Sequence, residues 1–197
     1  MVKTRKNKKR VFKKTKLKQM EGKKIPSVKL RTRVRVATNK RKKNPYRWKT
    51  VGTDSMFRNK KIVVFSLPGA FTPTCSSKHL PDFEKKYRDL TKRGIDDVYC
   101  ISVNDAFVMH NWKKKMKIKK VKLIPDGNGE FTEKMGALVK KNNLGFGNRS
   151  WRYSMLVDNG KIIKLFSEPN MGDNHKTDPF SVSSVHSMIN YIDSRDL

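Results

Sequence analysis

Apolar runs of strand length alternate with stretches of helical periodicity over most of the chain. Residues 61–67 and 98–103 are almost continuously apolar and β-branched, which is typical of central strands buried on both faces. Residues 76–93 carry apolar side chains at helical spacing and stop at Gly94. The same criteria predict further strands at 25–30, 32–36, 121–125, 151–157 and 161–167, a turn at 44–48, and helices from 105 to about 115, at 131–140 and at 183–192.

This order of elements predicts the fold class. Asp158, Asn159 and Gly160 separate the last two strands, and Asn-Gly between two alternating runs is a strong hairpin signal. Strands that alternate with helices and finish in a hairpin and a helix indicate an α/β fold, with a central mixed β-sheet covered by helices on both faces.

Charge divides the chain into two regions. The 197 residues hold 47 Lys and Arg against 17 Asp and Glu, a formal charge of +30. Residues 1–19 contain ten basic side chains and no acidic one. Such a segment has too few apolar residues to offset the entropy of ordering it. We expect residues 1–19 to be a basic, disordered tail and residues 20–197 to form one domain.

The two cysteines exclude a disulfide-dense secreted scaffold and leave room for a reactive thiol in a reducing compartment. No apolar run approaches the ~18 residues that span a bilayer. A cytoplasmic protein is therefore expected. An organellar location such as the mitochondrion is the alternative, because the basic, acid-free tail shares some features of a targeting peptide.

The candidate reactive residues lie in the segment between the strand at 61–67 and the helix that follows it. Cys75 falls in the first turn of that helix, where unpaired backbone N–H groups and the positive end of the helix dipole favour a thiolate. Thr72 lies three residues earlier, so its hydroxyl could reach the sulfur or a substrate oxygen. Pro68 and Pro73 stiffen the loop.

Three separated motifs in the same order carry a resemblance to a known family. The spacing of Pro68, Thr72 and Cys75 is the signature of the peroxiredoxins, which are thiol-dependent peroxidases. More narrowly, PGAFTPTCSSKHLPDF, CISVNDAFV and RYSMLVDNGKI resemble the subgroup that contains mammalian peroxiredoxin five. The resemblance covers residue 20 to the C-terminus and leaves the tail outside.

The resemblance implies a thioredoxin-like fold and a role for each motif residue. Cys75 would be the peroxidatic cysteine, whose thiolate attacks a hydroperoxide and becomes a sulfenic acid. Arg152 would lie beside the thiolate, where a guanidinium stabilises it and bonds the peroxide oxygens. Thr72 would orient the substrate, and Pro68 would shield the thiolate from water.

The residues alone leave alternatives open at two of these positions and at the second cysteine. Cys75 could be an inert buried thiol, because free cysteines often pack as small apolar side chains. Without the family motif, Arg149 or Arg47 could share the role given to Arg152. Cys100 lies inside an apolar run and is expected to be a core thiol rather than a resolving partner.

Some members of the subgroup carry a second cysteine after the late hairpin, but residues 168–176 contain none here. We therefore expect a one-cysteine cycle in which glutathione, with or without a glutaredoxin, or a thioredoxin reduces the sulfenic acid. The resemblance further implies a homodimer, with Phe71, Phe107 and Trp112 near the contact.

Neither a metal nor a nucleotide cofactor is expected. His79, His110, His175 and His186 are scattered without zinc-binding spacing, and no phosphate-binding glycine loop is present. His79 lies one helical turn after Cys75 and is expected to pack in the helix rather than to act as a base.

The tail supports a second class of function. Closely spaced Lys and Arg bind the phosphate backbone of nucleic acid by counterion release, and anionic surfaces attract them as well. The other possibility is a solvated tail that has no specific role. The alternative function is therefore a polyanion-binding protein that uses the peroxiredoxin fold as a scaffold.

Overall fold

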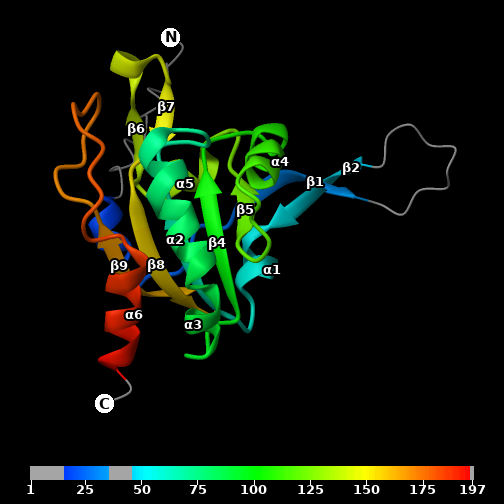
Figure 1. The fold of residues 1–197 in the computed structure, drawn as a ribbon, viewed down its shortest axis with the longest axis vertical. Helices are drawn as coiled ribbons and strands as arrows, with labels where there is room; N and C mark the ends of the chain where they lie inside the picture. The colour runs from blue at the N-terminus through cyan, green and yellow to red at the C-terminus, as the bar shows by residue number, and fades with distance from the viewer. Residues whose placement is uncertain (1–15, 36–45, 196–197) are drawn as a thin grey trace, which may run out of the picture.

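A five-stranded mixed sheet forms the centre of the computed structural model, which describes residues 16–35 and 46–195. Its strand order is β5-β4-β3-β8-β9 (Figure 1). The β3, β4 and β5 strands are parallel, whereas β8 pairs antiparallel with both β3 and β9. The strands are β3 (Lys61–Ser66), β4 (Asp97–Ser102), β5 (Lys122–Pro125), β8 (Tyr153–Asp158) and β9 (Lys161–Ser167).

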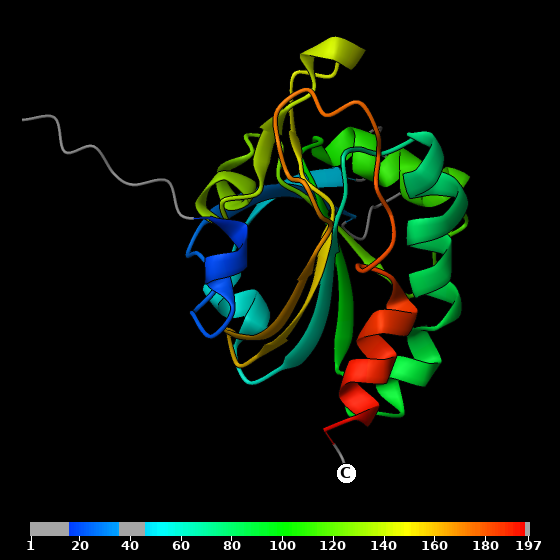
Figure 2. The same ribbon diagram turned by 90° about the vertical axis from the view of Figure 1, so that its left-hand side faces the viewer.

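Helices cover both faces of this sheet, which confirms the predicted fold class (Figure 2). One face carries the π-helical turn η2 (Cys75–His79) with α2 (Leu80–Lys85), α3 (Tyr87–Thr91), α4 (Ala106–Lys115) and α6 (Val185–Asp193). The other face carries η1 (Leu17–Met20), α1 (Thr53–Phe57) and α5 (Glu130–Lys134). None of the helices in the described residues is both long and apolar enough to cross a membrane.

Two apolar cores follow from this layering. Strand residues alternate between the faces, so Ile62 and Val64 of β3 join the core under α1 and α5, whereas Val63 and Phe65 join the core under α2, α4 and α6. Cys75 and Cys100 both belong to the second core. The reactive segment is thus built on the more helical face of the sheet.

Most predicted elements are present, and the differences have local causes. The predicted helix at 131–140 ends at Lys134, because Gly136 takes a left-handed φ of 70°, after which Leu138–Lys140 forms β6 and pairs with β7 (Asn148–Ser150). The predicted strands at 25–30 and 32–36 are one strand, β1 (Lys29–Arg35). Of the predicted turn at 44–48, the first two residues lie outside the described residues, and Tyr46 begins strand β2 (Tyr46–Gly52).

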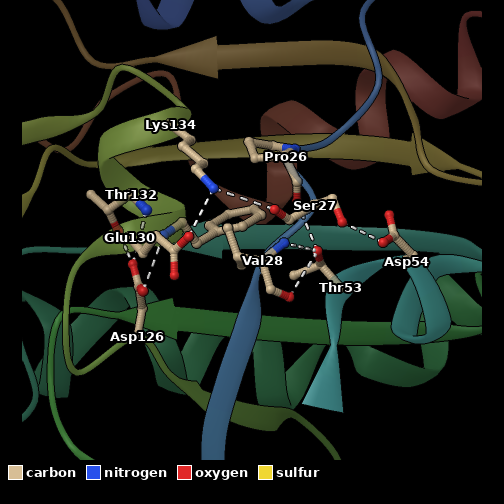
Figure 3. Close-up of polar contacts among 10 residues, drawn as sticks. Pro26, Ser27, Val28, Thr53, Asp54, Asp126, Glu130, Thr132 and Lys134 are labelled. Carbon is tan, nitrogen blue, oxygen red and sulfur yellow. Dashed lines mark hydrogen bonds and ion pairs between the residues drawn. The ribbon is translucent and has the colours of Figure 1, made fainter. Parts of the chain in front are cut away.

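Buried polar contacts fix the sheet face that carries α1 and α5 (Figure 3). The hydroxyl of Thr53 donates to the carbonyl of Pro26 at 2.7 Å and accepts from the N–H of Val28 at 3.0 Å, which joins the chain before β1 to the start of α1. Asp126 accepts hydrogen bonds from the backbone N–H and hydroxyl of Thr132, at 2.8 and 2.7 Å, and so caps α5.

The N-terminal part of the described chain packs on this same face. Leu17 is 1% exposed within η1, and Glu21 accepts a hydrogen bond from the N–H of Leu165 on β9 at 3.0 Å. The boundary predicted after residue 19 falls within this helix, so the packed part of the chain includes Leu17. Residues 1–15, which make up most of the predicted tail, lie outside the described residues.

A second sheet consists only of β1 and β2 and projects from the body as a two-stranded ribbon (Figure 1). The remaining short element, η3 (Asn142–Leu144), joins β6 to β7 above the sheet.

Candidate functional site

The loop that carries Cys75 is fastened to the ends of two central strands. It follows β3, and the N–H of Ala70 donates to the side-chain oxygen of Asn104, just after β4, at 2.9 Å. Thr72 closes the loop, because its hydroxyl donates to the carbonyl of Gly69 at 2.9 Å. Pro73 opens the helix at the position where its missing N–H costs no hydrogen bond.

Cys75 begins a π-helical turn inside the helix that follows. The N–H of Leu80 bonds the carbonyl of Cys75, five residues back, instead of the usual four. Such single wide turns occur often at functional sites. The Cys75 side chain is fully buried, so any molecule that reacts with its sulfur has to enter a site closed by protein.

A buried guanidinium lies beside this sulfur. Arg152 is 1% exposed and precedes β8, the strand next to β3. Its Nη2 lies 3.6 Å from Sγ of Cys75 and also donates to the carboxylate of Asp178. A positive charge at this distance attracts the negative charge of a thiolate and so stabilises it.

The second terminal nitrogen of Arg152 is held by a histidine. Nη1 lies 3.1 Å from Nδ1 of His79, and Nε2 of His79 lies 3.2 Å from the carbonyl of Ser183. Arginine only donates, so Nδ1 must accept and Nε2 must carry the proton that goes to Ser183. Burial, and then the charge of Arg152, hold the pKa of His79 well below its usual range, against the raising effect of the Ser183 bond.

Asp178 and Ser183 reach the site because a buried carboxylate holds their segment. Glu168 accepts from the backbone N–H groups of Ser181, Val182 and Ser183 at 2.9, 3.0 and 2.8 Å. It also accepts from the hydroxyls of Ser181 and Ser183 at 2.8 and 2.6 Å. Burial alone would raise the pKa of Glu168, but these hydrogen bonds outweigh it and lower the pKa. Glu168 is therefore held as an anion that fixes the chain over Arg152.

A cavity of about 300 Å³ adjoins the site. Pro68 and Thr72 line one side of it, and Lys141, Phe146 and Asp178 line the other. Lys141 is 2% exposed, and its Nζ lies 5.3 Å from the ring centroid of Trp151. Burial lowers the pKa of Lys141. Asp178 lines the cavity and also accepts from Arg152, so the cavity lies one side chain away from the guanidinium beside Cys75.

The structure brings Cys75 and Arg152 into contact, whereas the two other candidate arginines have different partners or positions. Arg149 donates to the carbonyls of Val103 and Phe146 at 2.6 and 3.1 Å, and Arg47 is exposed on β2. Cys100 is buried in the middle of β4, and burial raises the pKa of its thiol well above the usual range.

Sequence reasoning did not find two contacts of Arg152. His79 was expected only to pack in its helix, whereas its ring accepts a hydrogen bond from Arg152. Asp178 lies in a segment without periodicity, so no pattern pointed to it. Among the described residues, no group of three His, Cys, Asp or Glu side chains is arranged to hold a metal ion.

The chain is similar to known proteins over most of its length. The Redoxin family model matches residues 20–180. The chain is 56% identical over 173 residues to a peroxiredoxin of Synechocystis sp., covering 88% of this chain and 91% of that protein. It is 55% identical over 167 residues to a peroxiredoxin of Rhizobium etli, covering 85% and 93%.

Solved structures show the same likeness. The Plasmodium falciparum antioxidant protein, described as a 1-Cys peroxiredoxin, superposes with a TM-score of 0.82 at 39% identity. The match covers 88% of this chain and 99% of that one. This likeness confirms the thioredoxin-like fold that the sequence motifs implied.

Proposed function

Because this chain belongs to the peroxiredoxins, the family of thiol peroxidases, we propose that Cys75 is its peroxidatic nucleophile and Arg152 the residue that activates it. The observation that carries the proposal is the contact of 3.6 Å between Nη2 of Arg152 and the buried Sγ of Cys75. A thiolate is the nucleophilic form of cysteine, and a desolvated guanidinium beside it stabilises the negative charge more than water-exposed groups do.

The proposed step transfers one oxygen atom. The thiolate of Cys75 attacks the terminal oxygen of a hydroperoxide, an S–O bond forms, and the O–O bond breaks. The leaving oxygen takes the electron pair and a proton, which gives an alcohol or water, while the sulfur is oxidised to a sulfenic acid. Arg152 can donate to both oxygens as charge moves to the leaving one. Pro68 and Thr72 line the cavity beside the site, where they exclude water and orient the substrate.

We further propose a one-cysteine cycle. Cys100 lies in the core on β4, and residues 168–176 hold no cysteine. The likeness to a structure described as a 1-Cys peroxiredoxin supports this proposal. Glutathione with a glutaredoxin, or a thioredoxin, is the proposed reductant, and a homodimer is the proposed assembly. A Cys100→Ser variant should keep full turnover; a disulfide between Cys75 and Cys100 during turnover would refute the one-cysteine cycle.

The basic tail supports a second proposal, that the chain also binds polyanions. Ten basic residues within 1–19 suit nucleic acid or an anionic surface. Deletion of residues 1–15 leaves the buried Leu17 in place and should weaken salt-sensitive retention on nucleic acid. Equal retention of the shortened chain would assign the binding to the folded domain.

The peroxidase proposal is tested by a single turnover. Reduced protein is mixed with one equivalent of hydrogen peroxide in a stopped-flow instrument, and free thiols are counted in the wild type and in Cys75→Ser. We expect rapid loss of one thiol in the wild type and none in the variant. Equal loss in both proteins would reject Cys75 as the nucleophile.

A further inference from the structure

The ribbon formed by β1 and β2 concentrates positive charge on an exposed element. Its two strands carry six basic side chains and no acidic one. The basic residues are Lys29, Arg31, Arg33, Arg35, Arg47 and Lys49. The ribbon projects from the body (Figure 1), so most of these charges face solvent rather than the sheet. Like charges at this density repel one another unless a polyanion binds them.

Strand register places arginines and aromatic rings on one face of the ribbon. Arg33 pairs with Trp48, and Arg35 pairs with Tyr46. Because side chains alternate along a strand, Arg31 shares this face with Arg33 and Arg35. Cζ of Arg31 lies 5.6 Å from the ring centroid of Trp48. The face therefore alternates guanidinium groups with flat rings.

Phe107 of α4 supports this face from the body. Cζ of Arg33 lies 4.3 Å from the Phe107 ring centroid and 4.8 Å from that of Tyr46, so Arg33 is held between rings. Trp48 contacts Phe107 edge to face, with centroids 5.6 Å apart. Trp48 is nevertheless 53% exposed, which leaves ring surface open to a further flat group. Beside it lies a cavity of about 150 Å³, with Lys29 and Arg31 on the ribbon side and the acidic side chains of Asp105, Asp126 and Glu130 also in its lining. The phosphates are therefore expected along the ribbon rather than in this cavity.

We propose that this ribbon is a binding site for single-stranded nucleic acid. A base stacks on Trp48, and the neighbouring phosphates pair with the basic side chains on the same face, Lys29, Arg31, Arg33 and Arg35. Proteins usually bind single strands through basic grooves with exposed aromatic side chains. Every unpaired base can stack on an aromatic ring, whereas the faces of the bases in a duplex are already stacked on one another. A membrane surface fits less well, since Trp48 and Phe107 are the large apolar side chains exposed on this face within the part of the chain that the structure describes, and arginines surround them.

Trp48 supplies a site-specific readout. The other two tryptophans, Trp112 and Trp151, are 0% and 1% exposed, so fluorescence quenching by an added oligonucleotide reports on the ribbon and not on the N-terminal tail. The full-length chain is titrated with an oligothymidylate and an oligouridylate of about 15 nucleotides each, a length that covers one typical site. We expect both oligonucleotides to quench the fluorescence of Trp48. If four phosphates are neutralised, a plot of the logarithm of the binding constant against the logarithm of the salt concentration should have a slope of about −3.

Two variants test which residues bind. The double variant Arg31→Gln/Arg35→Gln, with the tail intact, should reduce the salt slope to about −1.5 and weaken binding by roughly tenfold or more. Trp48→Leu, followed by fluorescence anisotropy of a labelled oligonucleotide, should weaken binding by about tenfold through lost stacking. The double variant Lys85→Gln/Lys92→Gln removes the same charge from exposed positions on the helical face and should change binding little.

Several outcomes would overturn the proposal. Equal weakening by the ribbon and control double variants would show that only total charge matters. Absence of Trp48 quenching, with binding that disappears on tail deletion, would place the nucleic acid on the tail. Quenching by phosphatidylserine vesicles but not by either oligonucleotide would make the ribbon a membrane contact. Thermal unfolding of each variant verifies that the ribbon substitutions leave the fold intact.

Discussion

Replacement of Arg152 tests the electrostatic part of the mechanism. Nη2 of Arg152 lies 3.6 Å from Sγ of Cys75. At an effective dielectric constant of about 20, opposite unit charges at this distance attract by about 5 kcal/mol. The carboxylate of Asp178 contacts the same nitrogen and offsets part of this attraction. If about 3 kcal/mol remains, Arg152→Gln should slow the reaction of Cys75 with hydrogen peroxide by roughly 100-fold.

Arg152→Lys separates charge from geometry. A lysine keeps the positive charge, but its single nitrogen cannot bond His79 and contact the sulfur in the positions that the two arginine nitrogens occupy. We expect a rate between those of the wild type and Arg152→Gln. Stopped-flow measurement with excess peroxide gives the second-order rate constants, and circular dichroism verifies folding. A folded Arg152→Gln variant that reacts within about threefold of the wild type would refute the electrostatic argument.

Two further predictions concern stability and pH. Glu168→Gln should lower the free energy of unfolding by about 2 kcal/mol at pH 7, because the four charge-assisted hydrogen bonds to one carboxylate oxygen become neutral ones. The fifth bond, from the Ser181 hydroxyl, loses its acceptor, since an amide nitrogen only donates. Since the folded state depresses the pKa of Glu168, its contribution is complete above the unfolded-state value near pH 4.5 and is lost as pH falls through the lower folded value. Urea denaturation at pH 7 and pH 3 checks this, and a difference between the two proteins that is as large at pH 3 as at pH 7 would contradict it. For His79, whose folded pKa is also depressed, the contribution of the neutral ring to the free energy of unfolding is complete above about pH 6.5. This contribution declines as pH falls below that value. His79→Gln should remove this decline between about pH 6.5 and 5, and an unchanged pH profile would show that the ring is not held neutral in the fold.

The fold was largely predictable because its central elements have strong local patterns. The apolar runs at 61–67 and 98–103 form the parallel pair β3 and β4, and the Asn-Gly signal forms the hairpin of β8 and β9. The helix predicted at 131–140 is wrong in its second half. Gly136 was a visible stop signal there, but β6 gains its stability from pairing with β7 rather than from its own three residues.

The candidate site was predictable only as separate residues. The motif pointed to Cys75 and Arg152, which lie 77 residues apart, but their contact depends on the pairing of β3 with β8. The bond from Arg152 to His79 and the approach of Asp178 depend on the segment that Glu168 holds in place. Tertiary hydrogen bonds of this kind leave no periodic pattern in a sequence.

The most direct test of the account is to identify the atom that receives the peroxide oxygen. Reduced protein is treated with less than one equivalent of hydrogen peroxide in the presence of dimedone, which traps sulfenic acids, and is digested for mass spectrometry. The account predicts the dimedone adduct on Cys75, with Cys100 unmodified in its buried position on β4. An adduct on Cys100, or peroxide consumed without an adduct on Cys75, would contradict it.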